Sequence, residues 1–168
     1  MTELSLLIRS EQPIDDEAIE RLHERAFGPG RYARTASRLR EGAGHLPELS
    51  FTAMVGTLLV GSVRLTPVLA GREPALMLGP LAVEPAFESR GIGAALMRRS
   101  LDAARTRGHT LVLLVGDEPY YRRFGFKLIP QGLQLPGPVN PARFLALELE
   151  EGALARARGI VTPLPKEA

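Results

Sequence analysis

The chain has 168 residues, of which 45% are hydrophobic and 24% are charged, and its formal net charge is +2. This length and composition predict a single domain, residues 1–168, with a buried core. Cysteine is absent, which excludes disulfides, thiolate metal ligands and a cysteine nucleophile. The three histidines, His23, His45 and His109, show no metal-ligand spacing, so we expect no metal site.

Signals for membranes and nucleic acids are weak. The first apolar stretch is short and follows the acidic Glu3, and no apolar run approaches the length of a membrane span. We therefore expect a cytoplasmic protein with no membrane contact. The basic residues are almost all arginines and are not interleaved with aromatic residues, which argues against a nucleic-acid partner.

The first half of the chain predicts a strand, two helices and a hairpin. The strand covers Leu4–Arg9, and proline with acidic residues opens a helix that ends at Phe27. A polar helix is predicted over Tyr32–Glu41. Two β-rich runs, Ser50–Val55 and Leu58–Val68, flank Gly56-Thr57 and predict a two-residue hairpin.

The second half begins with a strand–helix–strand unit. A strand over Ala75–Val83, an amphipathic helix over Ile92–Arg107 and an apolar strand over Thr110–Val115 predict two parallel, adjacent strands. A short helix over Glu118–Phe124 follows. The remaining predicted elements are strands at Gly125–Ile129 and Phe144–Leu149, joined through a loop at Pro136–Pro141, then a helix at Glu151–Ala157 and a proline-bearing tail.

A glycine turn, Glu88–Ala94, connects the strand at Ala75–Val83 to the next helix. Its residues are Glu88, Ser89, Arg90, Gly91, Ile92, Gly93 and Ala94. Glycine removes the Cβ atoms that would block a close ligand, and a helix N-terminus favours an anion. A bound phosphate is therefore indicated, although a plain tight turn has the same pattern. A dinucleotide-binding turn is excluded, because Leu96 stands where its third glycine belongs.

The dipeptide Gly79-Pro80 interrupts the strand before this turn. Proline occurs in strands only at edges or bulges, so we expect a β-bulge that splays this strand from Thr110–Val115. Backbone groups of Leu81–Val83 would then be open to an extended amide-bearing ligand. An edge strand that stops at the proline is an equal alternative.

Tyr121 stands four residues before Gly125 and is a candidate general acid. A phenol keeps its proton at neutral pH and can donate it to a leaving thiolate. The alternative is core packing with Phe124 and Phe126, and for Tyr120 we favour that interpretation. Arg122 and Arg123 are typical solvated charges, although either could contact a phosphate.

Together these features resemble the GNAT superfamily of N-acetyltransferases. Its acetyl-CoA motif, Gln/Arg-x-x-Gly-x-Gly/Ala, is similar to Glu88–Gly93, except that Glu88 stands at the Gln/Arg position. The bulged strand of the family is similar to Leu76–Val83, and its strand–Tyr–Gly–Phe block is similar to Leu111–Phe126. The segments ERAFGP and PGPVNPARFLALEL resemble the YhbS-like branch. The implied fold is an α/β fold, a mixed sheet of about six to seven strands with helices on both faces.

The resemblance implies direct acetyl transfer from acetyl-CoA to an amine of a small molecule or protein. The implied cofactor-binding residues are Leu81, Ala82 and Val83 for the pantetheine arm, and Glu88, Ser89, Arg90, Gly91, Ile92, Gly93 and Ala94 for the pyrophosphate. A strand N–H near Leu81–Val83 would hold the oxyanion, and Tyr121 would protonate the CoA sulfur. Glu88 stands where the family motif has glutamine or arginine, so its negative side chain must point away from the pyrophosphate.

The acceptor and the general base are open at this stage. Glu84 and Glu24 are candidate bases, with a water relay as the alternative. We expect the acceptor site to be built from Phe27–Glu41, Ser50–Val68 and Pro136–Arg143. The protein is expected to be a monomer or a homodimer. Two other hypotheses are a CoA-binding sensor or protein-interaction module without catalysis, and a weaker one, a nucleic-acid binder.

Overall fold

The computed structural model describes residues 5–28 and 44–164. The helix predicted at Tyr32–Glu41 lies outside these residues. The strands are β1 (Leu6–Ser10), β2 (Phe51–Val55), β3 (Leu58–Ala70), β4 (Glu73–Val83), β5 (Leu111–Val115), β6 (Lys127–Leu128), β7 (Leu133–Gln134), β8 (Phe144–Glu148) and β9 (Gly159–Pro163). The helices are α1 (Asp16–Phe27), α3 (Ile92–Thr106), α4 (Glu118–Tyr121) and α5 (Ala153–Arg156).

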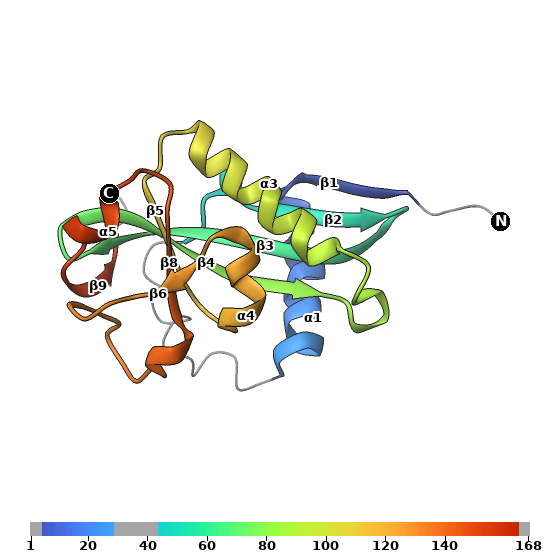
Figure 1. The fold of residues 1–168 in the computed structure, drawn as a ribbon. Helices are drawn as coiled ribbons and strands as arrows, with labels where there is room; N and C mark the ends of the chain where they lie inside the picture. Colours follow the sequence, from blue (N-terminus) through green and yellow to red (C-terminus); the bar gives the residue numbers. More distant parts are fainter. Residues whose placement is uncertain (1–4, 29–43, 165–168) are drawn as a thin grey trace.

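The strands form a mixed sheet in the order β1-β2-β3-β4-β5-β8-β6 (Figure 1). The pair β4–β5 is parallel and the other neighbours on this path are antiparallel. The hairpin predicted at Gly56-Thr57 is confirmed, since Val55 pairs with Leu58. The predicted parallel unit is confirmed as β4–α3–β5, and with it the mixed α/β fold class.

Helices cover both faces of the sheet, as expected. On one face, Ile92, Leu96 and Leu101 of α3 pack on buried residues of β2–β5. On the other, Ile19 and Leu22 of α1 pack on a separate apolar cluster. In β3, Gly61 allows α3 to come close, because a Cβ there would stand 2.9 Å from a methyl of Leu96.

The predicted bulge lies at Gly79–Pro80 in β4. Val63 pairs with Leu81 and Leu65 with Leu78, so the two bulged residues oppose the single Arg64 of β3. The peptide bond between Gly79 and Pro80 is cis. The ladder between β4 and β5 spans only two residue pairs, at Leu76 and Met77. The end of β4 beyond the bulge therefore pairs with β3 alone among the described strands.

The predicted C-terminal tail is wrong in one respect, because residues 159–163 form strand β9. β9 pairs with β3 at Val68–Ala70 and with β7, a strand that the sequence pattern did not indicate. β7 has only two residues and pairs with β9, and β9 in turn pairs with β3, which lies far away in the chain. The helix predicted at Glu151–Ala157 is the shorter α5.

Candidate functional site

The glycine turn (Glu88–Ala94) lies between the end of β4 and the first turn of α3. Gly91 is the N-cap of α3 with φ +80°, in the left-handed region that favours glycine, and Ser89 also has a positive φ of 64°. None of the backbone N–H groups from Ser89 to Ala94 donates to a carbonyl within the described part of the chain. These donors are therefore available to an anion at the helix N-terminus.

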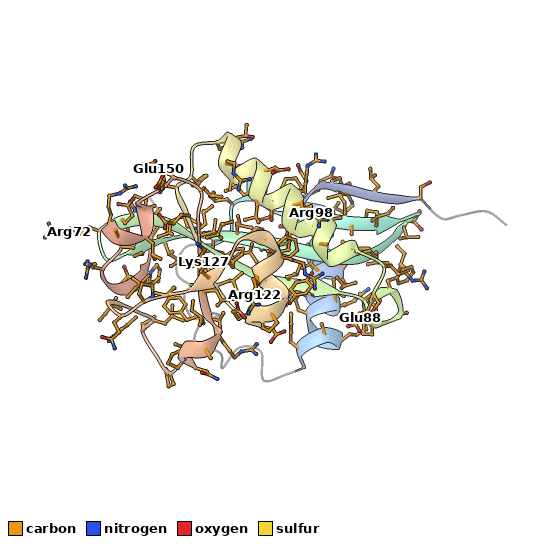
Figure 2. The ribbon with its side chains drawn as sticks, viewed as in Figure 1. Arg72, Glu88, Arg98, Arg122, Lys127 and Glu150 are labelled. Carbon is orange, nitrogen blue, oxygen red and sulfur yellow. The ribbon has the colours of Figure 1, made fainter. Side chains whose placement is uncertain are left out.

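The turn itself is exposed, and it carries both a cationic and an acidic side chain. Residues 88–91 are exposed, and the guanidinium of Arg90 lies 5.2 Å above the ring centre of Phe87. Glu88, the departure from the motif, lies at the loop between β4 and α3 (Figure 2). The turn thus has one cation and one carboxylate beside its free N–H groups.

The end of β4 presents backbone groups away from β3. The N–H of Glu84 donates to Val60 of β3 at 2.8 Å. Backbone groups in an antiparallel strand alternate in direction, so those of Ala82 also face β3, whereas those of Leu81 and Val83 face the diverging β5. An extended ligand could pair with Leu81 and Val83, and Ala82 lies between them with its side chain in the α1 cluster.

Tyr121, the candidate acid, lies where α4, β5 and the segment before β8 meet. Its ring packs against Gly116 and edge-on to Phe126, with ring centroids 6.0 Å apart. Burial raises the pKa of Tyr121 to about 12. Its hydroxyl makes no hydrogen bond with the described residues, so the proton remains available for donation.

The neighbouring Tyr120 has a position that the sequence did not indicate. Its hydroxyl lies 2.9 Å from where a Cβ on Gly93 would stand, at the first turn of α3. Its ring also packs edge-on against Tyr121 and Phe124, as expected for a packing residue. Aromatic composition alone indicated the packing but not the approach to Gly93, which arises from the placement of α4 beside α3.

Glu84, one of the two candidate bases, is engaged in an ion pair. Both of its carboxylate oxygens accept hydrogen bonds from Arg25 of α1, at 2.7 to 3.0 Å. This pair links α1 to the end of β4. Since Arg25 engages both oxygens of the carboxylate, the structure does not support the assignment of Glu84 as the base.

The expected acceptor region is described in part. Arg143, at the end of the predicted Pro136–Arg143 segment, accepts a hydrogen bond from Gly116 at 2.8 Å through its carbonyl, which brings this segment to the end of β5. Residues 29–41 of the expected region are outside the described ranges. Among residues 5–28 and 44–164, no three acidic or histidine side chains gather in a possible metal site. No helix in these same ranges is both long and apolar enough to cross a membrane.

Comparisons with known proteins agree with this arrangement. The model of the acetyltransferase (GNAT) family matches residues 16–126. The uncharacterized N-acetyltransferase YhbS of Escherichia coli strain K12 is 31% identical over 159 residues, which are 93% of this chain and 95% of YhbS. A second uncharacterized N-acetyltransferase of the same strain, YjhQ, is 30% identical over 74% of this chain and 71% of its own length.

Solved structures show the same fold. The crystal structure of Escherichia coli YhbS in complex with CoA has a TM-score of 0.81 at 28% identity and covers 98% of this chain and 92% of its own. A GNAT acetyltransferase from Brucella melitensis in complex with acetyl-CoA has a TM-score of 0.66 at 30% identity, with 87% and 89% covered. By its sequence match and its fold, this chain belongs to the GNAT family of acetyltransferases.

Proposed function

We propose that the protein transfers the acetyl group of acetyl-CoA directly to an amine of a small molecule or a protein, with Tyr121 as general acid. The observation that carries the proposal is that two sets of backbone groups without partners in the sheet or helix lie next to each other. The N–H groups of the glycine turn have no backbone acceptor in the described chain, and Leu81 and Val83 face away from β3 beside them. Relatives with this fold were crystallised with CoA or acetyl-CoA.

In this proposal the two sets bind different parts of one molecule. The pyrophosphate lies on the N–H groups of Ser89–Ala94, where the helix dipole and Arg90 add positive charge. The amide-bearing pantetheine arm lies along Leu81 and Val83 as an added strand would. Together these contacts hold the thioester at the opening between β4 and β5, and such positioning supplies much of the rate gain.

The chemical step forms a C–N bond and breaks the C–S bond. The neutral amine nitrogen attacks the thioester carbonyl, and a strand N–H near Leu81–Val83 stabilises the oxyanion. Tyr121 donates its proton to the departing sulfur, and the nitrogen loses its own proton to water. Water takes this role because Arg25 already binds both oxygens of Glu84.

The raised pKa of Tyr121 keeps its proton in place at neutral pH. A group with a pKa of about 12 remains protonated up to well above neutral pH. We therefore expect kcat not to fall between about pH 8 and about pH 10, because Tyr121 keeps its proton throughout that window. A fall in kcat there that is lost in Tyr121→Phe would contradict the assignment of a high pKa.

The first experiment measures acetyl-CoA binding by calorimetry and turnover with a panel of amines. In Tyr121→Phe we expect kcat to fall about a hundredfold, because general-acid assistance is lost, with the affinity for acetyl-CoA unchanged. A thermal melt of the variant controls for folding. An unchanged kcat would remove Tyr121 from the acid role.

Two other results would lead elsewhere. No binding of acetyl-CoA at millimolar concentration would overturn the proposed function. Binding without turnover of any amine would instead favour a CoA-binding sensor with the GNAT fold, for which the ion-paired state of Glu84 is the specific supporting observation.

A further inference from the structure

Four side chains form a continuous stack on the surface between α3 and the α4 region. The guanidinium of Arg98, in α3, lies 5.7 Å from the ring centre of Phe124. Phe124 and Tyr120 pack edge-on with centroids 5.7 Å apart. The guanidinium of Arg123 lies 4.5 Å from the ring centre of Tyr120, and its Nε donates to the Tyr120 carbonyl at 3.0 Å. Two aromatic rings therefore hold two arginines in place.

These two arginines differ from the neighbouring Arg122 in charge balance. Arg122 pairs with Glu118, whose oxygens accept two hydrogen bonds at 2.8 Å. Arg98 and Arg123, by contrast, form no ion pair with any acidic residue of the described chain. Both are exposed, and Figure 2 shows Arg98 on α3 and Arg122 directly after α4. The stack therefore carries two positive charges that no carboxylate within residues 5–28 and 44–164 neutralises.

The stack begins at the glycine turn. The Tyr120 hydroxyl lies at Gly93, and Arg123 packs on the same ring. Arg98 is five residues further along α3 than Gly93, which corresponds to a rise of about 7.5 Å along the helix. A series of ring contacts through Phe124 and Tyr120 thus connects both guanidinium groups to the turn on which the proposed function places the pyrophosphate.

We propose that Arg98 and Arg123 bind the phosphomonoester on the ribose of CoA and so select CoA over dephospho-CoA, which lacks that group. The inference rests on the proposed function, which places the pyrophosphate on the turn. A phosphomonoester carries close to two negative charges and three acceptor oxygens, and arginine matches such a group with its planar set of donors. Holding the guanidiniums on rings reduces the conformational entropy lost on binding.

The test titrates CoA and dephospho-CoA separately into the whole protein by calorimetry. The wild-type protein should bind CoA about tenfold more tightly, as expected for the gain of one exposed charge-assisted contact. Arg98→Ala and Arg123→Ala should each lose most of this difference, and the double variant all of it. Their affinity for dephospho-CoA should stay at the wild-type value.

Two neighbouring arginines provide matched controls. Arg122→Ala removes the arginine that is paired with Glu118, and Arg99→Ala removes the next residue of α3, whose guanidinium lies over Phe51 instead. Both should keep the wild-type preference for CoA. If either control loses it as fully as Arg98→Ala and Arg123→Ala do, general surface charge explains the preference and the proposal is overturned.

The remaining outcomes separate this inference from the proposed function. If the wild-type protein binds CoA and dephospho-CoA equally, the role of Arg98 and Arg123 is wrong while the proposed function stands. The same holds if the two variants weaken both ligands to the same extent. If the wild-type protein binds neither ligand, the proposed function fails, and this inference fails with it.

Discussion

Gly91 and Gly93 belong to one motif but are required for different physical reasons. Gly91 has a left-handed backbone with φ +80°, which disfavours any side chain. Gly93 is an ordinary helical residue, and what disfavours a side chain there is the lack of space. A Cβ would stand 2.9 Å from the Tyr120 hydroxyl and 3.7 Å from a methyl of Val83. A substitution at Gly93 therefore tests the ligand-facing side of the turn without forcing a new backbone conformation.

We predict that Gly93→Ala weakens CoA binding without destabilising the protein. Alanine favours a helix over glycine by about 1 kcal/mol, and the atom it meets is the movable end of the Tyr120 side chain. The new methyl nevertheless displaces that hydroxyl and crowds the N–H groups, so the affinity for CoA should fall about tenfold. Calorimetry and urea denaturation of the same variant measure the two effects. Lower stability with unchanged affinity would contradict the prediction.

At the scale of elements, a charge network centred on the buried pair Arg64–Glu11 joins the start of α1 to the sheet. Arg64 of β3, opposite the bulge, donates to Glu11 at 2.8 Å and to Asp16 at 3.0 Å, and His45 contacts the other oxygen of Glu11. Burial by itself would raise the pKa of Glu11, but the hydrogen bonds from His45 and Arg64 outweigh it and lower that pKa. The network therefore holds α1 and the segment before β2 against β3.

We predict that Arg64→Met destabilises the fold by about 3 kcal/mol at neutral pH, because it leaves Glu11 charged with one cationic partner fewer. The Glu11 side chain is 7% exposed, so water cannot replace the lost contact. Adding Glu11→Gln removes the buried charge and should recover part of the loss, as measured by urea denaturation. If the free energy of unfolding of Arg64→Met lay within about 1 kcal/mol of the wild-type value, Arg64 would not have this stabilising role.

The sign of the pH dependence follows from the direction of the Glu11 shift. A lowered pKa stabilises the fold above the ordinary carboxyl range, and this contribution is lost as the pH falls and Glu11 binds a proton. The deficit of Arg64→Met should therefore shrink as the pH falls below about 4.5.

At the scale of the whole molecule, the C-terminal segment closes one end of the sheet. β9 lies between β3 and β7, and Val161 is fully buried in an apolar cluster with Val68, Ala70 and Leu133. The N–H of Gly71, at the turn between β3 and β4, donates to the carbonyl of Ile160 at 3.1 Å. Figure 1 shows α5 and β9 together at this end of the sheet, away from α1.

We predict that Val161→Ala lowers the free energy of unfolding by about 2 kcal/mol, from two lost methyl groups and the cavity they leave. Ile160→Ala is the matched control, because its neighbouring side chain is 54% exposed and should cost less than about 0.5 kcal/mol. Urea denaturation of the two variants measures the difference. Equal effects would show that β9 does not support the core.

Short-range patterns accounted for much of this molecule. The hairpin at Gly56-Thr57, the strand–helix–strand unit and the bulge at Gly79–Pro80 depend on turn residues and hydrophobic periodicity within a few positions. The glycine turn was recognisable for the same reason, since glycine spacing and the helix that follows are local properties of the backbone.

Long-range contacts decided the rest. The pairing of β9 with β3, the ion pair of Glu84 with Arg25 and the approach of Tyr120 to Gly93 each join segments far apart in the chain. No local pattern encodes which distant carboxylate, ring or strand edge becomes a neighbour, because that depends on how the helices pack on the sheet. The sequence by itself thus determined where the glycine turn forms, and only the tertiary structure decided which side chains surround it.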